Sequence, residues 1–426
     1  MYDSDIAIPK VISEIYNNTV FIINQLFKKD KCNMTQLIEG IHCSVPHENI
    51  TAQARKLRDF YALKPRAPLI HKEFGYYCLD RWYEEGLNKD CDFKEFFGYD
   101  DVALHALTDL GWVEAEFYPR FDVKIIEKRD DDTEVEQDFA GRHVLYFKDR
   151  RNGFMPEYLD HPVKDLKSWE ENVKWRLNPE TSERLKVIKG SADAAVAAAK
   201  RGEVICQRLI GGYMYLRSLI GPEELFYMFI DKPELIHDCM KTWLKLADAV
   251  TTKYQQYVTY DEIFFAEDIC YNHGSLISPD MMKEFLTPYY QQLVTNVKSR
   301  QLDKTRRLFI QVDTDGFCDP VIPIYQEAIG MDYMSPFEVA SKCDVVRTGK
   351  EYPELLISGG IDKRILAKSK DAIDRELDRI IPTMMERGGY IPTCDHGVPE
   401  EVSLENYMHY RKRMLEYSPL NPAGTV

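Results

Sequence analysis

With 426 residues, 44% of them hydrophobic and 29% charged, the chain can bury a large core and has the composition of an ordinary globular protein. Its formal net charge of −15 argues against nucleic acid and against an anionic membrane surface, because both demand a basic face. No apolar run is long enough for a transmembrane helix.

The cysteines and the first residues indicate the compartment. None of the ten cysteines forms a CxxC pair, and the start, MYDSDIAIPK, lacks the basic and apolar regions of a signal peptide. We therefore expect reduced, mostly buried thiols and a cytoplasmic protein.

The first part of the chain is expected to be a helical extension covering residues 1–60. The segment KVISEIYNNTVFIINQLF spaces its apolar residues three and four apart, which is typical of a helix. In the mixed region that follows, EAEFYPRFDVKIIEKRDDDTEVEQDFAGRHVLYF alternates like strands joined by an acidic turn at 129–133.

From about residue 180, helical stretches alternate with short apolar runs. These runs are EVICQRLIG, EIFFAEDIC, RRLFIQVDTDG, MDYMSPFE, ELLISGGID and YIPTCDHG. Such alternation indicates βα units around a parallel sheet. With PLIHKEF near residue 70 and one strand from the middle, the runs would close a (β/α)8 TIM barrel, an α/β fold, over residues 61–420. An open doubly wound sheet is the alternative, but no GxGxxG turn follows the first strand.

Reactive side chains stand where the apolar runs end, which is where a barrel builds its active site. They are Arg208, Glu267, Asp268, Asp313, Asp315, Glu338, Asp362, Cys394 and His396, with His71 and Glu73 added by the first strand. Each has a simpler interpretation: Asp362 can cap the next helix, and Cys394 can be a small buried hydrophobe. Their convergence on one predicted rim favours a functional site.

Metal binding is one hypothesis for this rim. Asp313 and Asp315 lie two residues apart, as do Cys394 and His396, so each pair points the same way from an extended strand end. Carboxylate, thiolate and imidazole ligands suit zinc or another divalent ion. We take Asp313, Asp315 and Cys394 as the predicted ligands, although no compact motif such as HExxH occurs.

The same residues carry a family resemblance. The C-terminal stretch from GGIDKRILAKSK through YIPTCDHGVPEEVSLENYMHYRKRM closely resembles the signature of the uroporphyrinogen decarboxylase superfamily. AEDICYNHGSLISPDMMKEFLTPYYQQL and YLDHPVKDLKSWEENVKWRLNP are similar to members of the same group. The resemblance covers roughly residues 50–418 and implies a (β/α)8 barrel.

The resemblance implies one of two activities. True decarboxylases carry a segment like RQAGRYLPEY, whereas this chain has PLIHKEFGYYCLD, without an arginine pair. An acidic mouth would also repel a tetrapyrrole with eight carboxylates, so we reject that activity. Cobamide-dependent methyltransferases hold zinc with a His-x-Cys-Gly strand end and a later Cys. Asp313 and Asp315 occupy the first two positions here, and Cys394 matches the later Cys.

This departure disfavours zinc activation of a thiol, because oxygen ligands suit a more Lewis-acidic ion or no ion. The carboxylates suit a methyl donor whose oxygen or nitrogen becomes a good leaving group only when it is protonated or bound to a metal. The sequence predicts a methyltransferase that moves a methyl group from a small donor to a separate corrinoid protein, because the chain lacks a DxHxxG motif. A methoxylated aromatic is one candidate donor.

The predicted catalytic residues are Glu267, Asp315 and His396. The predicted substrate-binding residues are His71, Tyr76, Trp82, Arg208, Asp268 and Glu338. Two alternatives stay open: a metal-dependent lyase or decarboxylase acting on a small carboxylate, and a non-catalytic binding barrel. The sequence leaves open the donor, the metal and whether the chain forms a homo-oligomer.

Overall fold

The computed structural model describes residues 50–108, 110–129, 132–147 and 157–418. Most of the expected helical extension, residues 1–49, lies outside the described residues. No helix in the described ranges is long and apolar enough to cross a membrane.

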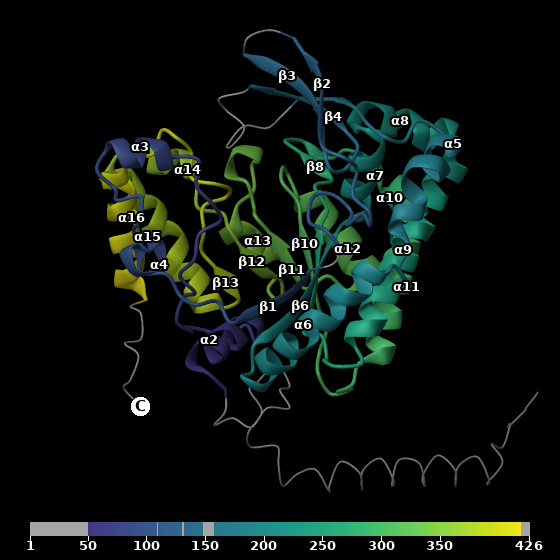
Figure 1. Cartoon of the computed structure of the whole chain (residues 1–426). Helices are drawn as coiled ribbons and strands as arrows, with labels where there is room; N and C mark the ends of the chain where they lie inside the picture. Colours follow the sequence, from purple (N-terminus) through teal and green to yellow (C-terminus); the bar gives the residue numbers. More distant parts are fainter. Residues whose placement is uncertain (1–49, 109, 130–131, 148–156, 419–426) are drawn as a thin grey trace, which may run out of the picture.

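Seven parallel strands form one curled sheet at the centre of the molecule (Figure 1), in the order β1-β6-β7-β10-β11-β12-β13. They are β1 (Leu104–Thr108), β6 (Val204–Ile210), β7 (Glu262–Ala266), β10 (Phe309–Asp313), β11 (Tyr333–Ser335), β12 (Leu356–Ser358) and β13 (Tyr390–Ile391). The middle strands are buried on both faces, as the apolar runs predict.

Helices connect these strands and cover the outside of the sheet (Figure 1). They are α6 (Ser182–Lys200), α7 (Gly212–Ile220), α8 (Pro222–Asp231), α9 (Pro233–Tyr254), α10 (Pro279–Phe285), α11 (Thr287–Arg300), α12 (Ile322–Ile329), α13 (Val345–Glu351), α14 (Lys363–Leu366), α15 (Lys370–Arg387) and α16 (Leu404–Tyr417). Parallel strands alternating with outer helices confirm the predicted TIM-barrel fold.

The expected strand PLIHKEF differs from the prediction, because residues 68–75 form no strand ladder. Side chains hold this segment instead. The His71 N–H donates to the Asp100 carboxylate just before β1, at 2.6 Å, and the Glu73 carboxylate accepts from the Cys394 N–H just after β13, at 2.8 Å. Pro68 also lacks the N–H that a ladder needs. The segment therefore bridges β13 and β1 without regular pairing.

One end of the barrel is closed by α2 (Ala52–Tyr61). Thr51 caps this helix by accepting a hydrogen bond from the Ala54 N–H. Leu57, Phe60 and Tyr61 pack against the first residues of the strands, so the segment that precedes the barrel in sequence forms its floor.

A four-stranded antiparallel sheet stands at the end of the barrel opposite α2 (Figure 1). It contains β2 (Lys124–Lys128), β3 (Thr133–Gln137), β4 (His143–Phe147) and β5 (Glu157–Asp160), and the β2–β3 pair confirms the predicted strands around the acidic turn. The remaining short elements are α3 (Leu79–Glu84), α4 (Phe93–Phe97), α5 (Leu166–Ser168), η4 (Trp169–Val173), η5 (Lys174–Leu177), β8 (Cys270–Tyr271), β9 (Gly274–Ser275), η6 (Asp319–Val321) and η7 (Val339–Ser341).

Candidate active site

A cavity of about 520 Å³ runs from the C-terminal ends of the strands down to α2. This volume lies within the range of about 300–1,000 Å³ that small-molecule sites occupy. Six of the residues predicted for the rim line it: Glu73, Arg208, Asp268, Asp313, Asp315 and His396. The prediction that residues at the strand ends share one rim therefore gave the position of the cavity and part of its lining.

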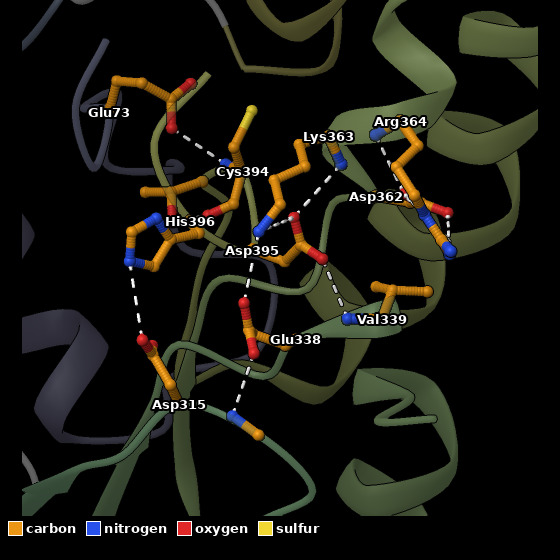
Figure 2. Close-up of polar contacts among 12 residues, drawn as sticks. Glu73, Asp315, Glu338, Val339, Asp362, Lys363, Arg364, Cys394, Asp395 and His396 are labelled. Carbon is orange, nitrogen blue, oxygen red and sulfur yellow. Dashed lines mark hydrogen bonds and ion pairs between the residues drawn. The ribbon is translucent and has the colours of Figure 1, made fainter. Parts of the chain in front are cut away.

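Asp315 and His396 face each other at the mouth of the cavity (Figure 2), with 3.6 Å between the Asp315 Oδ2 and the His396 Nε2. Burial, together with repulsion from neighbouring carboxylates, raises the pKa of Asp315 to about 8. Burial lowers the pKa of His396, and the cation of Lys363 lowers it further. Near neutral pH the pair is therefore a carboxylic acid beside an uncharged imidazole.

Asp313 lies on the last residue of β10 and lines the cavity beside Asp315. Its carboxylate accepts a hydrogen bond from the Ser335 hydroxyl. Burial raises the pKa of Asp313 to about 7, although the Ser335 hydrogen bond and two nearby cations oppose the shift. The cavity thus holds a second carboxyl group that titrates near neutrality.

Asp268 adopts a left-handed backbone conformation, with φ at +44°. This conformation is uncommon for a residue other than glycine and clusters at functional sites. The Asp268 N–H contacts the Asp313 carbonyl at 3.3 Å, and its carboxylate pairs with Arg217 at 3.1 Å. The ion pair with Arg217 therefore fixes the position of the Asp268 carboxylate.

Two carboxylates tie the strand-end loops together instead of lining the cavity (Figure 2). Glu338 accepts from the Gly316 N–H at 2.9 Å and from the Lys363 ammonium at 3.2 Å. The fully buried Asp395 accepts from the backbone N–H groups of Val339 and Lys363. These bonds join the loops after β10, β11, β12 and β13, so both carboxylates fix the shape of the mouth.

Asp362 caps α14, as its simpler interpretation proposed. Its carboxylate accepts from the Arg364 N–H at 2.9 Å and pairs with the Arg364 guanidinium (Figure 2). Nearby, Gly359 has a φ of +98°, and a Cβ there would lie 1.7 Å from the Pro336 carbonyl oxygen. The glycine therefore lets the chain after β12 pass against the loop after β11.

Three predicted substrate-binding residues lie away from the cavity. His71 is buried and its Nε2 contacts the Ser418 carbonyl. Trp82 is fully buried and donates to the Val402 carbonyl at 2.8 Å, and Tyr76 packs against its ring. His71 and Tyr76 follow the irregular course of the chain and Trp82 lies on α3, and Tyr76 and Trp82 both pack against α16 and α4 as part of the core.

Glu267 also lies behind the cavity wall. It is fully buried, and its carboxylate accepts from the Tyr290 hydroxyl at 2.6 Å and the Tyr213 N–H at 3.1 Å. Burial raises the pKa of Glu267 to about 7. Asp268 lines the cavity, whereas the bonds of Glu267 direct its side chain toward α7 and α11.

The predicted metal ligands do not gather around one point. Asp313 and Asp315 line the cavity, whereas Cys394 does not, and its sulfur points away from Asp315 in Figure 2. Burial also raises the pKa of the Cys394 thiol, which disfavours the thiolate that a metal needs. These three side chains do not fit a metal in this arrangement, and their role as ligands stays a prediction.

Within the described residues, a different group does bring three ligand atoms within 4.8 Å of one another: Cys318, Asp319 and Cys343. The two sulfur atoms lie 3.7 Å apart, and the Asp319 carboxylate pairs with Arg347. None of the three lines the cavity, so a metal held there would support the loops and would not reach a substrate.

Sequence reasoning missed Lys72, Trp112 and Phe264, which all line the cavity. Trp112 stacks on Phe264 with ring centroids 4.8 Å apart and an angle of 11° between the planes. Arg208 lies over both rings. Phe264 is an inward residue of β7, which the alternation of that strand could have revealed, whereas nothing local distinguishes Trp112.

The comparisons with known proteins agree with this fold. The family described as uroporphyrinogen decarboxylase (URO-D) matches residues 151–417. A uroporphyrinogen decarboxylase from Syntrophotalea carbinolica is 22% identical over 180 residues, which are 42% of this chain and 50% of that relative. The chain thus matches about half the length of that curated relative. A methyltransferase from Methanosarcina mazei superposes with a TM-score of 0.53 at 12% identity, covering 86% of this chain and 98% of that one.

Proposed function

Since the chain belongs to the uroporphyrinogen decarboxylase family and folds as a (β/α)8 barrel, we propose that it is a methyltransferase that demethylates a small donor. The acceptor is the cobalt of a corrinoid carried by a separate protein. The structural likeness to the Methanosarcina mazei methyltransferase extends over most of both chains and supports this choice of activity within the family.

The observation that carries the proposal is the pair of Asp315 and His396, which face each other at the cavity mouth. The Asp315 pKa of about 8 keeps a proton available near neutral pH, and the uncharged His396 lies 3.6 Å away. A methyl ether or methylated amine is a poor methyl donor until its oxygen or nitrogen gains a proton. A positioned acid of suitable pKa supplies that proton and typically accelerates such steps by about 10²–10⁴-fold.

In the proposed step, the bond between the methyl carbon and the donor oxygen or nitrogen breaks. Its electron pair stays on the leaving atom, which takes the proton of Asp315. The methyl group bonds to cobalt(I), which supplies the electron pair of the new bond. Asp313 holds a second proton in the same cavity, and Asp315 regains its proton from solvent at the mouth.

The corrinoid protein must approach the same mouth, because cobalt has to reach the methyl carbon directly. The antiparallel sheet at this end of the barrel exposes Ile125 and Ile126, with 49% and 45% of their surface accessible (Figure 1). Exposed apolar side chains beside a functional opening are typical of a protein docking surface.

The test is methyl transfer to cob(I)alamin, followed by the change of its absorption spectrum to that of methylcobalamin. We expect transfer from at least one methoxylated aromatic or methylated amine. Absence of transfer from every such donor, with a folded protein and with the corrinoid supplied both free and on a carrier protein, would contradict the proposal.

A second candidate is a lyase or decarboxylase acting on a small carboxylate, predicted from the sequence as metal-dependent. The cations Lys72 and Arg208 in the cavity favour it, since they can bind a carboxylate. Product analysis separates the two activities, because decarboxylation releases CO2 without a corrinoid, whereas methyl transfer yields the demethylated donor.

A further inference from the structure

Two buried cysteines, Cys318 and Cys343, meet outside the cavity, where two neighbouring loops of the barrel pack together. Cys318 stands directly before η6, in the connection that follows β10, and Cys343 lies between η7 and α13, after β11. Their sulfur atoms lie 3.7 Å apart, although 25 residues separate them in the chain. Two buried thiols can simply pack as small apolar groups, so a ligand site needs more than this contact.

A carboxylate turns the pair into a group of three ligand atoms. Asp319 follows Cys318 in the chain, and a carboxylate oxygen of Asp319 lies within 4.8 Å of both sulfur atoms. Arg347 binds the Oδ2 atom of Asp319, and the Thr348 hydroxyl contacts Oδ1 at 3.5 Å. Such outer contacts orient a ligating carboxylate, whose four lone-pair sites leave room for a metal as well.

The distance between the two sulfur atoms fits a shared zinc ion. Thiolates bind zinc at about 2.3 Å in tetrahedral geometry, which places two of them about 3.8 Å apart. The observed 3.7 Å matches this spacing, whereas the sulfur atoms of a disulfide lie about 2.05 Å apart. Two thiolates with one carboxylate suit zinc better than calcium or magnesium, which prefer oxygen ligands.

Geometry separates this group from Cys394. Burial raises the pKa of the Cys394 thiol, and the hydrogen bond with Cys343, followed by burial, raises the pKa of Cys318. A metal at either thiol must therefore displace a proton. At Cys318 two further ligand atoms stand beside the sulfur and compensate for that loss, whereas the ligands predicted with Cys394 do not gather.

We propose that Cys318, Asp319 and Cys343 bind one Zn²⁺ ion, which joins the loop after β10 to the loop after β11. Both thiols release their protons to solvent on binding, and the metal accepts electron pairs from the two sulfur atoms and one carboxylate oxygen. The Asp319 side chain keeps 18% of its surface accessible, so zinc enters from this side and a water molecule completes the tetrahedral shell.

A metal at this position supports the loop that carries Asp315. Gly316 already joins the same two loops, because its N–H donates to Glu338 and its carbonyl accepts from the Cys343 thiol at 3.4 Å. Zinc bound at Cys318 restrains the chain on the other side of Gly316. The inference does not depend on which ligand the cavity binds or which reaction it performs.

Zinc binding to the full chain is the first measurement. The protein is stripped of metal, kept reduced with a phosphine, and titrated with Zn²⁺ against a chromophoric chelator of known affinity. We expect one zinc ion per chain with a Kd below about 1 μM. Co²⁺ in place of zinc should show the charge-transfer absorption of cysteine thiolates. Absence of zinc binding at this concentration, or of that absorption, overturns the proposal.

Variants then assign the metal to its ligands. Cys318→Ala and Cys343→Ala should each weaken zinc binding about 100-fold or more, because loss of an outer-shell partner alone costs about 10–100-fold. Cys239→Ala removes a buried thiol on α9 and is the matched control, with the affinity of the wild type. Cys394→Ala should also bind zinc normally. Binding that is lost in Cys394→Ala and kept in Cys318→Ala would place the metal at the cavity mouth and refute the assignment.

Thermal unfolding shows whether the variants fold and whether zinc binds the folded chain. Zinc should raise the Tm of the wild type and of Cys239→Ala, because it binds the folded state, and leave the Tm of Cys318→Ala unchanged. Cys318→Ser keeps the size of the side chain and takes its place if Cys318→Ala does not fold. An equal rise in Tm for the wild type and for the variants at positions 318 and 343 would overturn the proposal.

Discussion

At the scale of single residues, the cavity separates two kinds of carboxyl group. Asp268 forms an ion pair with Arg217, and Glu338 and Asp395 accept hydrogen bonds from backbone N–H groups outside the cavity lining. Asp313 and Asp315 line the cavity, and burial raises their pKa values to about 7 and 8. Carboxyl groups that titrate near neutrality in a cavity are candidates for acid–base chemistry.

The pH dependence of methyl transfer follows from Asp315. If the protonated acid is the active form, kcat/KM should be constant below pH 7 and fall as the pH rises through about 8. Asp315→Asn should lower kcat/KM by about 10²-fold or more, because Asn has no proton to donate. The measurement is the pH profile of methyl transfer at saturating corrinoid protein.

The control for this profile is Asp362→Asn, because Asn still caps α14 and position 362 lies outside the cavity. It should keep the wild-type profile. An Asp315→Asn enzyme with full activity and an unchanged fall near pH 8 would remove Asp315 from the reaction.

At the scale of elements, the sequence predicted the barrel strands β6, β7, β10, β11, β12 and β13 and the β2–β3 pair, because their apolar runs are bounded by turns. It placed Arg208, Asp313, Asp315 and His396 in one cavity because parallel strands end at the same rim. The predicted strand PLIHKEF was wrong, because the backbone N–H groups of Leu69 and His71 donate to the side chains of Ser418 and Asp100 and not to a neighbouring strand. Lys72 lies within that segment, and for the same reason the sequence did not predict it as a residue of the cavity lining.

The antiparallel sheet yields a prediction for the partner. The double variant Ile125→Asp and Ile126→Asp should raise the KM for the corrinoid protein at least about tenfold, because charges would be placed in an apolar contact. The rate with free cob(I)alamin should not change, since neither residue lines the cavity.

The matched control is Leu302→Asp. Leu302 is 57% accessible and lies in the loop between α11 and β10, on the opposite end of the barrel. It should leave both acceptors unaffected. An equal effect of the two sets of variants, or no effect of the Ile125 and Ile126 pair, would place docking elsewhere.

At the scale of the whole molecule, raised carboxyl pKa values make folding depend on pH. Glu267, Asp313 and Asp315 have pKa values of about 7 to 8 when folded, well above those of exposed carboxyl groups. Between about pH 4 and 7 the folded chain holds protons that the unfolded chain has released. These three groups should therefore lower the free energy of unfolding as the pH rises through this range, whereas His71 and His161, whose pKa values burial lowers to about 4, act in the opposite direction.

Thermal unfolding of wild type and Glu267→Gln at pH 5 and at pH 8 tests this linkage. Between pH 5 and pH 8 the Tm of Glu267→Gln should fall less, or rise more, than that of the wild type, because one of the retained protons no longer titrates. Burial raises the pKa of Asp362, but its bonds to Arg364 outweigh this and lower it, so Asp362→Asn should keep the wild-type change in Tm. The same change in Tm for the wild type and Glu267→Gln would contradict the shift assigned to Glu267.

The floor that α2 provides has a consequence for specificity. Leu57, Phe60 and Tyr61 reach the cavity from a helix that carries none of the residues of the mouth. The side chains of α2 therefore limit the length of ligand that fits, whereas the proposed acid that acts on the ligand comes from a separate part of the chain, the strand ends. Exchange of a single α2 side chain for a larger or smaller one can retune which donors enter while the acid at the rim stays untouched.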